Sequence, residues 1–586
     1  MNKTIPEIFF ENARKYPNKP ALLYKKEGVY FPISYAEFAQ KVEVFSSYLL
    51  TLGLGKGDKV AILSENRPEW AISDLAVMSI GAVTVPLHTT FNPRAVCAVL
   101  NHCEAKVVVV SSGDLLNKIL LEENDLKKVE KIIFIDNLAN SQKEKLGSKI
   151  IGWSDIFSKN YKTKNEKIFL DANACCSIIY TSGTTGDPKG VVLSHSNFIS
   201  NIESINKAVP IRESDVFLSF LPLSHVLERL AGYYTPIYCG STIAYAEGIK
   251  QLPVNLKEIK PTIMVSVPRV FEKFYDAVWD KINSSSKFKK VIFKWALKQK
   301  KDTLSYKLAN ILVFKKIRNQ MGGNFRFIVS GGASLSDNIA KFFSKIGILI
   351  IEGYGLTETS PVIALNLVEN FRFGTVGKVL PDVELKITRE KQILVKGPNV
   401  FCEYYNNKDE TAKCFDKEGW FYTGDLGFID KDGFLTVTGR SKEMIITSGG
   451  KNVSPEKVEN FLNNDRFISQ AMAIGNKRKF ISALIVPDWQ EVEIYFKQNN
   501  IKLEEHEKMI KNPVLLKIIQ DRINDKINPN LHEFEQIRKF AILPQEFSQE
   551  KEELTATLKL RRHIIEKHYQ KTIDCMYDNK LKNGCG

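Results

Sequence analysis

One short segment limits what this chain can fold into and bind. Residues 180–190 read YTSGTTGDPKG and combine hydroxyl side chains, three glycines and Lys189. Glycines let a backbone turn tightly and bring its N–H groups close to a ligand, and hydroxyls and a lysine add donors and positive charge. Because β-type residues stand on both sides, the segment predicts a strand, a polyphosphate-binding loop and a second strand. The alternative interpretation is an ordinary Ser/Thr/Gly hairpin loop.

The segment differs from a Walker A loop, in which the lysine opens a helix. Here the lysine follows a proline, and the residues after it favour a strand. Kinase motifs are absent as well. The sequence therefore predicts a nucleotide site outside the kinases and the P-loop NTPases.

Length and composition restrict the class of protein further. A chain of 586 residues exceeds what one hydrophobic core accommodates, so we expect at least two domains. No apolar run of eighteen residues and no signal-peptide core appear, and the nine cysteines show no C-x-x-C spacing. These features predict a cytoplasmic protein without a membrane-spanning helix. The net charge of +15 favours anionic partners, but no nucleic-acid motif accompanies it.

The order of the expected elements indicates an α/β fold. Apolar strands are expected at residues 59–63, 81–87 and 106–110, with a helix over 68–80 between the first two. This alternation is typical of a parallel sheet covered by helices. The sequence therefore predicts a large N-terminal α/β domain.

The second half of the chain changes in texture. From about residue 376 to 440, short strands alternate with turns, which predicts a β-rich subdomain. A boundary is expected near residue 440. Residues 441–586 then predict a smaller α+β domain, and residues 1–440 the N-terminal domain that contains the β-rich part.

A basic segment stands out between residues 281 and 318, where twelve Lys or Arg residues occur with one acidic residue. Within it, Phe288, Val291, Ile292 and Trp295 have the spacing of one helix face. A basic amphipathic helix of this kind can lie in an anionic membrane interface. The alternative is a helix that packs on the domain and exposes its lysines to water.

A second candidate motif follows an apolar run at residues 348–351. Residues 353–359 read GYGLTET, and we expect them at the end of a strand. Tyr354 could stack on an adenine, and Thr357 could bond a phosphate oxygen. Glu358 could hold Mg²⁺, which usually takes one or two protein carboxylates together with phosphate oxygens.

Taken together, these residues resemble the AMP-forming acyl-CoA synthetases of the adenylate-forming superfamily. Five motifs occur in the family's order: residues 180–190, 353–359, 420–427, 439–443 and 553–562. Residues 220–229 resemble the acyl-pocket motif, and residues 266–273 with the tail 560–562 are typical of the long-chain branch. The resemblance covers roughly residues 5–577.

The resemblance implies a role for each matched residue. Lys559 would be the catalytic lysine, assisted by Lys189, Thr357 and Glu358, and Glu358 would also bind Mg²⁺. Asp425 would accept hydrogen bonds from the ribose hydroxyls. Without the resemblance, it would be interpreted as an aspartate in a turn. The implied nucleotide-binding residues are Thr181, Ser182, Gly183, Thr184, Thr185, Gly186, Lys189, Gly331, Gly332, Ala333, Tyr354, Gly355, Thr357, Asp425, Arg440 and Lys442.

Other positions are assigned in the same way. His225 would line the carboxylate end of the acyl pocket, although a lone histidine is often structural. The hinge of the C-terminal lid would be Lys442, and the CoA tunnel would be bordered by Gly449, Gly450 and Lys451. Two positions depart from the family: Arg229 stands where some bacterial members have a gating tryptophan, and Ala556 stands where proline is usual.

The reaction implied by the resemblance has two steps. ATP and a long-chain fatty acid give acyl-AMP and pyrophosphate, and CoA then displaces AMP. Three alternatives stay open: a ligase that delivers acyl-AMP to a carrier protein, a ligase for medium-chain or aromatic acids, and a non-catalytic lipid-binding protein on the same scaffold. Intact residues at the five motifs disfavour the last.

Overall fold

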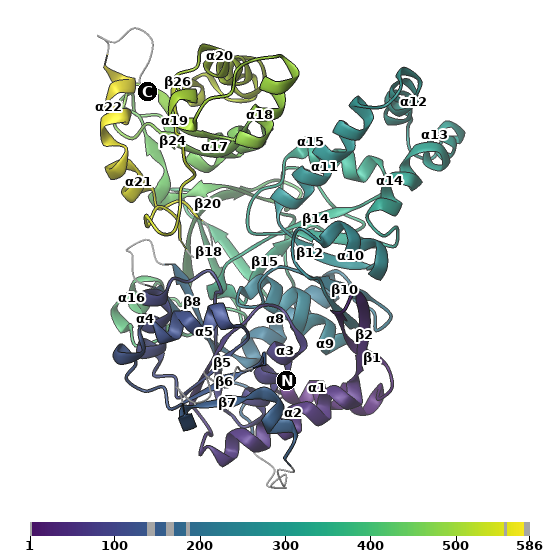
Figure 1. The fold of residues 1–586 in the computed structure, drawn as a ribbon, viewed down its shortest axis with the longest axis vertical. Coiled ribbons are helices and arrows are strands. Elements are labelled where there is room, and N and C mark those ends of the chain that lie inside the picture. Colours follow the sequence, from purple (N-terminus) through teal and green to yellow (C-terminus); the bar gives the residue numbers. More distant parts are fainter. Residues whose placement is uncertain (1–2, 138–146, 160–168, 183–187, 556–558, 579–586) are drawn as a thin grey trace. The chain divides into compact units, whose positions relative to one another are not determined.

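A computed structural model describes residues 3–137, 147–159, 169–182, 188–555 and 559–578 (Figure 1). The chain forms two compact units. Unit 1 consists of Met1–Lys386, Leu394–Thr423 and Ile429–Thr436, and unit 2 consists of Ile387–Ile393, Gly424–Phe428 and Val437–Gly586. The predicted fold class is confirmed: a large α/β part carries the N-terminal region, and a smaller part follows.

The first sheet of unit 1 has eight strands in the order β19-β9-β8-β4-β3-β5-β6-β7. Its central strands run parallel, whereas β9 pairs antiparallel with β8. Fully buried valine runs such as β5 are typical of a sheet covered on both faces. The strands are β3 (Lys59–Leu63), β4 (Val83–Leu87), β5 (Val107–Val110), β6 (Lys131–Phe134), β7 (Ile150–Gly152), β8 (Cys175–Ser182), β9 (Pro188–Ser194) and β19 (Glu403–Tyr404).

The second sheet of unit 1 has nine strands in the order β16-β15-β14-β13-β12-β10-β11-β1-β2. Strands β10 to β14 are parallel, and antiparallel strands close both edges. The strands are β1 (Pro20–Lys26), β2 (Val29–Ser34), β10 (Val216–Ser219), β11 (Thr242–Tyr245), β12 (Ile263–Ser266), β13 (Phe327–Ser330), β14 (Ile350–Gly355), β15 (Val362–Leu365) and β16 (Lys378–Val379).

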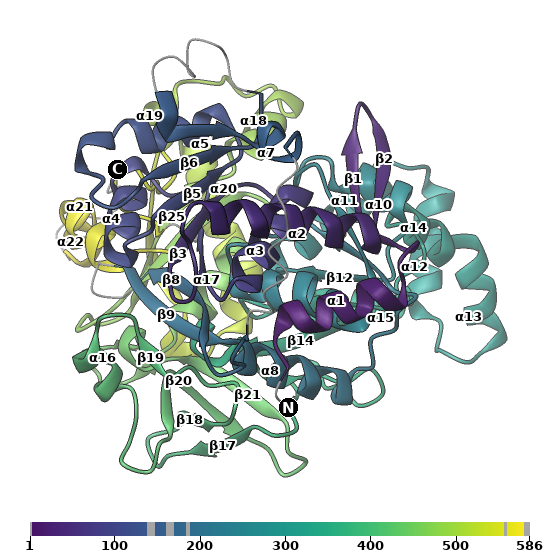
Figure 2. The same cartoon turned by 90° about the horizontal axis from the view of Figure 1, so that it is seen from below.

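Helices cover these sheets. In Figure 2, α1, α2 and α3 lie side by side, in agreement with their mutual contacts. The main helices of unit 1 are α1 (Ile5–Lys15), α2 (Tyr35–Thr51), α3 (Pro68–Ser79), α4 (Pro93–Cys103), α5 (Gly113–Leu120), α7 (Trp153–Phe157), α8 (His195–Ala208), η3 (Glu228–Tyr234), α9 (Thr235–Cys239), α10 (Leu252–Ile259), α11 (Pro268–Asn283), α12 (Lys287–Lys298), α13 (Leu304–Ala309), η4 (Asn310–Phe314), α14 (Lys315–Gln320), α15 (Asp337–Lys345), η5 (Thr357–Thr359) and α16 (Lys408–Lys413).

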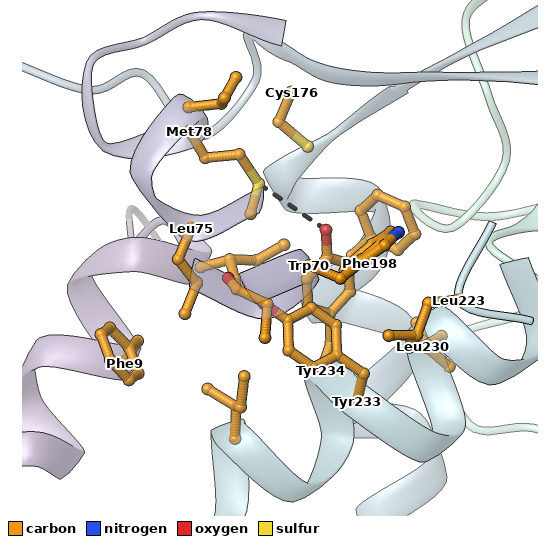
Figure 3. Close-up of a cluster of buried hydrophobic side chains, with 14 of the residues drawn as sticks. Phe9, Trp70, Leu75, Met78, Cys176, Phe198, Leu223, Leu230, Tyr233 and Tyr234 are labelled. Atoms are coloured by element: carbon orange, nitrogen blue, oxygen red, sulfur yellow. Dashed lines mark hydrogen bonds between the residues drawn. The ribbon is translucent and has the colours of Figure 1, made fainter. Parts of the chain in front are cut away.

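The core of unit 1 joins α3, α8 and η3 in one apolar cluster (Figure 3). Trp70 and Tyr233 meet edge to face with ring centroids 5.6 Å apart, and Phe198 meets Tyr234 at 5.1 Å. All four rings are almost completely buried. Aromatic pairs in this geometry add stabilisation beyond the burial of their area.

A four-stranded sheet corresponds to the predicted β-rich segment, and its order is β17-β18-β20-β21. Unit 2 adds a two-stranded and a three-stranded sheet, the latter in the order β24-β25-β26. The strands are β17 (Glu384–Ile387), β18 (Gln392–Lys396), β20 (Phe421–Ile429), β21 (Leu435–Arg440), β22 (Ile445–Ile446), β23 (Asn452–Val453), β24 (Ile468–Ile474), β25 (Ile481–Pro487) and β26 (Ile537–Ile542). The main helices are η6 (Ser441–Glu443), α17 (Pro455–Asn463), α18 (Trp489–Gln498), α19 (His506–Met509), α20 (Pro513–Arg522), η7 (Ile523–Ile527), α21 (Arg562–His568) and α22 (Gln570–Tyr577).

Within the described ranges, no helix has the length and apolar character needed to cross a membrane.

Candidate active site

The predicted phosphate loop is flanked by two strands. Strands β8 and β9 pair antiparallel, and Thr181 lies opposite Lys189 in the register. Ser182 is the last residue of β8. The loop residues themselves, Gly183, Thr184, Thr185 and Gly186, lie outside the described residues. The strands thus hold Thr181 and Lys189 at the two ends of the loop.

Lys189 lies in a cluster of polar side chains. Its Nζ is 2.5 Å from Oε2 of Glu410 and 5.4 Å from the ring centroid of Tyr404. The Tyr404 hydroxyl donates a hydrogen bond of 2.7 Å to Oε1 of Glu358. The structure therefore brings two predicted site residues, Lys189 and Glu358, to the same aromatic ring.

The charges in this cluster are set by the lysines. The hydrogen bond from Lys189, supported by Lys413 and by the charges of both lysines, lowers the pKa of Glu410 to about 2. Burial and the neighbouring Glu358 carboxylate raise the pKa of Tyr404, which keeps its hydroxyl as a donor. Glu410 is consequently a carboxylate at neutral pH and a natural counter-ion for Lys189.

Sequence reasoning missed Tyr404 and Glu410. Neither residue belongs to a motif that we recognised, and Glu410 is 221 positions away from Lys189 in the chain. Strand β19 places Tyr404 near the loop, because it pairs with β9 so that Tyr404 lies opposite Val191. Glu410 lies on α16, the helix that follows β19. The sequence contains no spacing signal for such a long-range neighbour.

The second motif lies at the end of a strand, as the sequence predicts, but the strand extends beyond the apolar run at residues 348–351. Strand β14 does not end before Gly353; it continues to Gly355 because β15 pairs with it antiparallel. Gly355 is required here, since a Cβ atom would lie 1.7 Å from the carbonyl oxygen of Pro361. Tyr354 therefore lies within a strand, and Thr357 and Glu358 follow on the short helix η5.

The glycine pair after β13 follows Ser330, which lies opposite the buried Glu352 in the register of β13 and β14. Gly331 is in close contact with Leu227, because a Cβ at Gly331 would lie 2.9 Å from a methyl carbon of that leucine. Glu352 accepts a hydrogen bond of 3.1 Å from the backbone of Leu335, and burial raises its pKa to about 7. Glu352 directly precedes the second motif but was not singled out, because a carboxylate at the end of an apolar run carries no pattern of its own.

His225 is fixed by its own helix start. Its Nδ1 accepts a hydrogen bond of 3.2 Å from the backbone N–H of Leu227. A second histidine, His88, lies 6.4 Å away between ring centroids, and its Nδ1 is 2.8 Å from the hydroxyl of Ser224. Burial lowers the pKa of His88 to about 4, so its ring is neutral at pH 7. His88 was also missed, since it stands alone after strand β4.

Arg229, at the position where the resemblance would allow a gating tryptophan, lies in the core. It forms a fully buried ion pair with Asp74, and it donates hydrogen bonds to the hydroxyls of Tyr234 at 2.8 Å and Ser177 at 2.6 Å. Its guanidinium also lies 5.4 Å from the Trp70 ring centroid. Arg229 therefore links η3 to α3 and β8.

In unit 2, the two predicted ribose residues form a pair. Arg440, at the end of β21, places its Nε 3.3 Å from Oδ1 of Asp425. The interpretation of Asp425 as a turn residue is wrong, because it lies within the nine-residue strand β20. Asp425 is buried while Arg440 is partly exposed.

Lys559 is joined to Thr555 by two hydrogen bonds, one to the backbone and one to the side chain. Thr555 donates to the carbonyl of Lys559 at 2.8 Å, and the Lys559 N–H donates to the Thr555 hydroxyl at 3.0 Å. Just beyond it, Arg562 donates two hydrogen bonds of 2.6 Å to Glu459 on α17. This bidentate pair anchors the segment that carries Lys559.

The charges of the ribose pair act on Lys559. Desolvation and the positive charge of Arg440 lower the pKa of Lys559. Glu456, Glu443 and Asp425 oppose that shift through their negative charges. Within unit 2, three predicted site residues, Asp425, Arg440 and Lys559, therefore share one electrostatic environment.

The remaining predicted positions of unit 2 lie on turns. Gly449 and Gly450 connect β22 to β23, and Gly450 adopts a φ of +71°. The Lys451 N–H donates to the Thr447 hydroxyl at 3.2 Å and closes that turn. Lys442 lies in the short helix η6 directly after Arg440.

Comparison with known proteins identifies the class. Residues 9–405 match the model of the AMP-binding enzymes, and residues 442–581 match that of the AMP-binding enzyme C-terminal domain. The chain therefore belongs to the AMP-binding enzyme family.

Two curated relatives narrow the comparison. The long-chain-fatty-acid–CoA ligase FadD15 of Mycobacterium bovis is 34% identical, with 98% of this chain and 97% of the relative covered. The human long-chain-fatty-acid–CoA ligase ACSBG2 is 31% identical, with 98% and 92% covered. Among solved structures, the adenylation domain of a carboxylate reductase from Mycobacterium chelonae has the same fold, with a TM-score of 0.81, 21% identity and 98% and 91% coverage.

Proposed function

We propose that this protein is an AMP-forming long-chain fatty acid–CoA ligase. The observation that carries the proposal is the gathering of the motif residues: Lys189 and Glu358 both contact Tyr404 in unit 1. In unit 2, Asp425 and Arg440 form an ion pair whose charges act on Lys559. The substrate class is supported by relatives that are named for long-chain fatty acids and cover nearly the whole chain.

The first step converts a poor electrophile into a mixed anhydride. The fatty acid carboxylate attacks the α-phosphorus of ATP, and pyrophosphate leaves. Lys189 and the loop that it ends would hold the departing phosphates, and Lys559 would stabilise the charge at the α-phosphate. No protein nucleophile is needed, because alignment and charge stabilisation account for the catalysis.

Glu358 is the residue that would hold Mg²⁺. Its carboxylate oxygens are the donor type that Mg²⁺ prefers, and it lies near Lys189, where the phosphates would bind. The bound ion would neutralise phosphate charge. Tyr404 would orient Glu358 through its hydrogen bond. Asp425 and Arg440 would bind the ribose of the nucleotide. Tyr354 and the glycine pair after β13 would lie near its base.

In the second step, CoA reacts with acyl-AMP, and this reaction does not need Lys559. We assign residues 1–440 to an adenylation domain and residues 441–586 to a lid that turns about Lys442 after acyl-AMP has formed. The turn at Gly449, Gly450 and Lys451 would then border the tunnel for the pantetheine arm. The CoA thiol attacks the acyl carbonyl, and AMP leaves.

We place the enzyme in the cytoplasm, on the inner face of the membrane. Long-chain fatty acids partition into bilayers, so an enzyme at that surface meets its substrate at high local concentration. The basic segment 281–318 favours an anionic surface.

Mass spectrometry of products tests the reaction. Purified protein is incubated with ATP, Mg²⁺ and fatty acids of graded length, with and without CoA. We expect acyl-CoA and AMP with long chains, and we expect Glu358→Ala to abolish both. Acyl-AMP that accumulates and does not react with CoA would establish the carrier-directed ligase instead. A preference for short or aromatic acids would correct the substrate class. If no acid is turned over, the alternative of a lipid-binding protein would be favoured.

A further inference from the structure

A helical projection of unit 1 carries apolar side chains on its outer surface. It comprises α12, α13, η4 and α14, in which α12 contacts both α13 and η4. Figures 1 and 2 both show α12 and α13 at the periphery of unit 1. The inner side is anchored in the core, since Phe293 and Ala296 of α12 are buried together with Phe314 of η4.

The outer side of α12 is not the side that packs. Phe288 is 73% exposed and Val291 is 65% exposed, although both belong to the face that the sequence predicts as apolar. The buried residues lie on another side of the helix, around Phe293. Helix α12 therefore packs on the domain with most of its lysines in water, as the alternative from the sequence expects, and Trp295 of the predicted face packs partly against the core. Phe288 and Val291 of the same face remain exposed.

The second helix of the projection also exposes large apolar side chains. Leu304 is 83% exposed, Leu308 49%, Ile311 64% and Leu312 42%. Their spacing of four, three and one residues keeps them on one side of the helical run from α13 into η4. Six large apolar side chains on two contacting helices are more than the scattered exposure that is normal for a protein surface.

Positive charge surrounds these side chains. Residues 281–318 contain twelve Lys or Arg residues against one acidic residue, Asp302. Ten of the twelve are exposed, including Lys287, Lys294 and Lys298 on α12 and Lys315 on α14. A second copy of the chain would bring like charges together at this surface, whereas an anionic lipid bilayer offers both negative headgroups and an apolar interior.

We propose that α12, α13 and η4 form the surface by which the protein docks on an anionic lipid bilayer, with Phe288, Val291, Leu304, Leu308, Ile311 and Leu312 inserted below the headgroups. The exposed lysines contact the headgroups. The inference rests on the proposed function only for its biological purpose, which is to take a fatty acid from the bilayer; the docking itself requires no catalysis.

Vesicle flotation with the purified full-length protein tests the proposal, in the absence of ATP, CoA and fatty acid. Vesicles of phosphatidylcholine with a quarter phosphatidylglycerol are compared with pure phosphatidylcholine. We expect binding at least about tenfold stronger to the anionic vesicles, and its loss in high salt. Equal binding to both kinds of vesicle, or to neither, would overturn the proposal.

Two sets of variants identify the surface. The triple variant Phe288→Ser, Leu304→Ser, Ile311→Ser should bind anionic vesicles at least about tenfold more weakly. Lys287→Gln, Lys294→Gln and Lys298→Gln should each cost about fivefold. The matched control is Val29→Ser with Val254→Ser, two valines that are 59% and 52% exposed on β2 and α10 and that should leave binding unchanged.

Two further outcomes decide against the membrane. If the apolar triple variant binds vesicles like the control, this surface is not the docking site. If sedimentation shows a dimer of the unaltered protein that the triple variant abolishes, a second copy covers the surface. Because flotation uses no substrate, a protein that binds vesicles but makes no acyl-CoA would refute the proposed reaction alone. A protein that makes acyl-CoA but does not bind would refute this inference and the proposed membrane location, and would leave the reaction intact.

Discussion

Arg229 and Lys189 each pair with a carboxylate in unit 1, but their surroundings are opposite. The side chains of Arg229 and Asp74 are both 0% exposed. Those of Lys189 and Glu410 are 19% and 31% exposed. Removing one partner of a buried pair leaves a charge that nothing compensates, whereas an exposed pair contributes only about 0–1 kcal/mol to stability.

The comparison shows which cation is available to a ligand. Arg229 is surrounded by Asp74, Tyr234, Ser177 and Trp70, so it has no path to a nucleotide. Lys189 can exchange Glu410 for a phosphate because the exchange exposes no buried charge. A motif identifies a cation, but burial decides whether that cation supports the fold or the reaction.

The largest effect is expected at the buried pair. Asp74→Asn should lower the free energy of unfolding by about 3–5 kcal/mol, because it leaves the Arg229 charge buried and unpaired. Urea denaturation of the full chain measures this. The control is Asp382→Asn, which removes an exposed pair with Lys207 and should cost less than about 1 kcal/mol. Equal losses in the two variants would remove the distinction between the pairs.

Lys559 should show the largest catalytic effect among the cations. Lys559→Ala should slow the formation of acyl-AMP by about 10²–10³-fold, since it removes a charge that acts on the transition state. The conversion of supplied acyl-AMP to acyl-CoA should continue at its normal rate. Single-turnover assays of the two half-reactions measure both rates, with Lys551→Ala, an exposed lysine of the same segment, as the control. Equal loss in both half-reactions would argue against a role confined to adenylation.

Lys189 should act mainly on nucleotide binding. Lys189→Met should raise the KM for ATP by about tenfold to a hundredfold, the value of a charged hydrogen bond of about 1.5–3 kcal/mol, and should leave the unfolding free energy nearly unchanged. Lys413→Met is the control because Lys413 contacts the same Glu410 at 2.8 Å. A KM that the two variants change equally would mean that Lys189 has no special access to ATP.

His88 makes stability depend on pH. Burial lowers its folded-state pKa from 6.5 to about 4, so between these values the unfolded chain binds the proton more readily. The stabilising contribution of neutral His88 to the free energy of unfolding is therefore complete above pH 6.5. It decreases as the pH falls toward 4, by up to about 1.4 kcal/mol per pH unit. Denaturation curves of His88→Asn should show a shallower decline over this window, while the equally buried His195 still titrates. An identical decline in both proteins would contradict the assignment.

The smallest effect is expected from the counter-ion of Lys189. Glu410→Gln should lower the KM for ATP by no more than about fivefold, because the phosphates no longer compete with a carboxylate for that lysine. Steady-state kinetics at several ATP concentrations measure the change. A higher KM would instead mean that Glu410 holds Lys189 in the position that ATP requires.

Local patterns predicted much of the fold. Strand β3 and the helix α3 after it follow from apolar runs and a proline at the helix start, and their observed bounds agree closely with the expectation. The interpretation of Asp425 as a turn residue is wrong, because it lies inside β20. Tyr354 lies at the end of β14 as expected, but the strand continues to Gly355. Glycines beside these residues suggested turns, and the neighbouring strands that extend the pairing are not visible locally.

The site was predictable only in part for the same reason. Lys189 and Glu358 carry recognisable motifs, but Tyr404, which contacts both, and Glu410 come from a distant segment. The burial of Arg229 likewise depends on its ion pair with Asp74 in α3, which is far away in the chain. Sequence reveals the chemical groups, whereas burial and long-range partners require the structure.

The most direct test puts Asp74→Asn and Lys189→Met through both assays, the free energy of unfolding and the KM for ATP. The account predicts that each variant changes one quantity: Asp74→Asn destabilises the fold and keeps the KM of the folded enzyme, and Lys189→Met raises the KM and keeps the stability. A Lys189→Met protein as unstable as Asp74→Asn, with an unchanged KM, would contradict the central claim that access to solvent separates the cations of the reaction from those of the core.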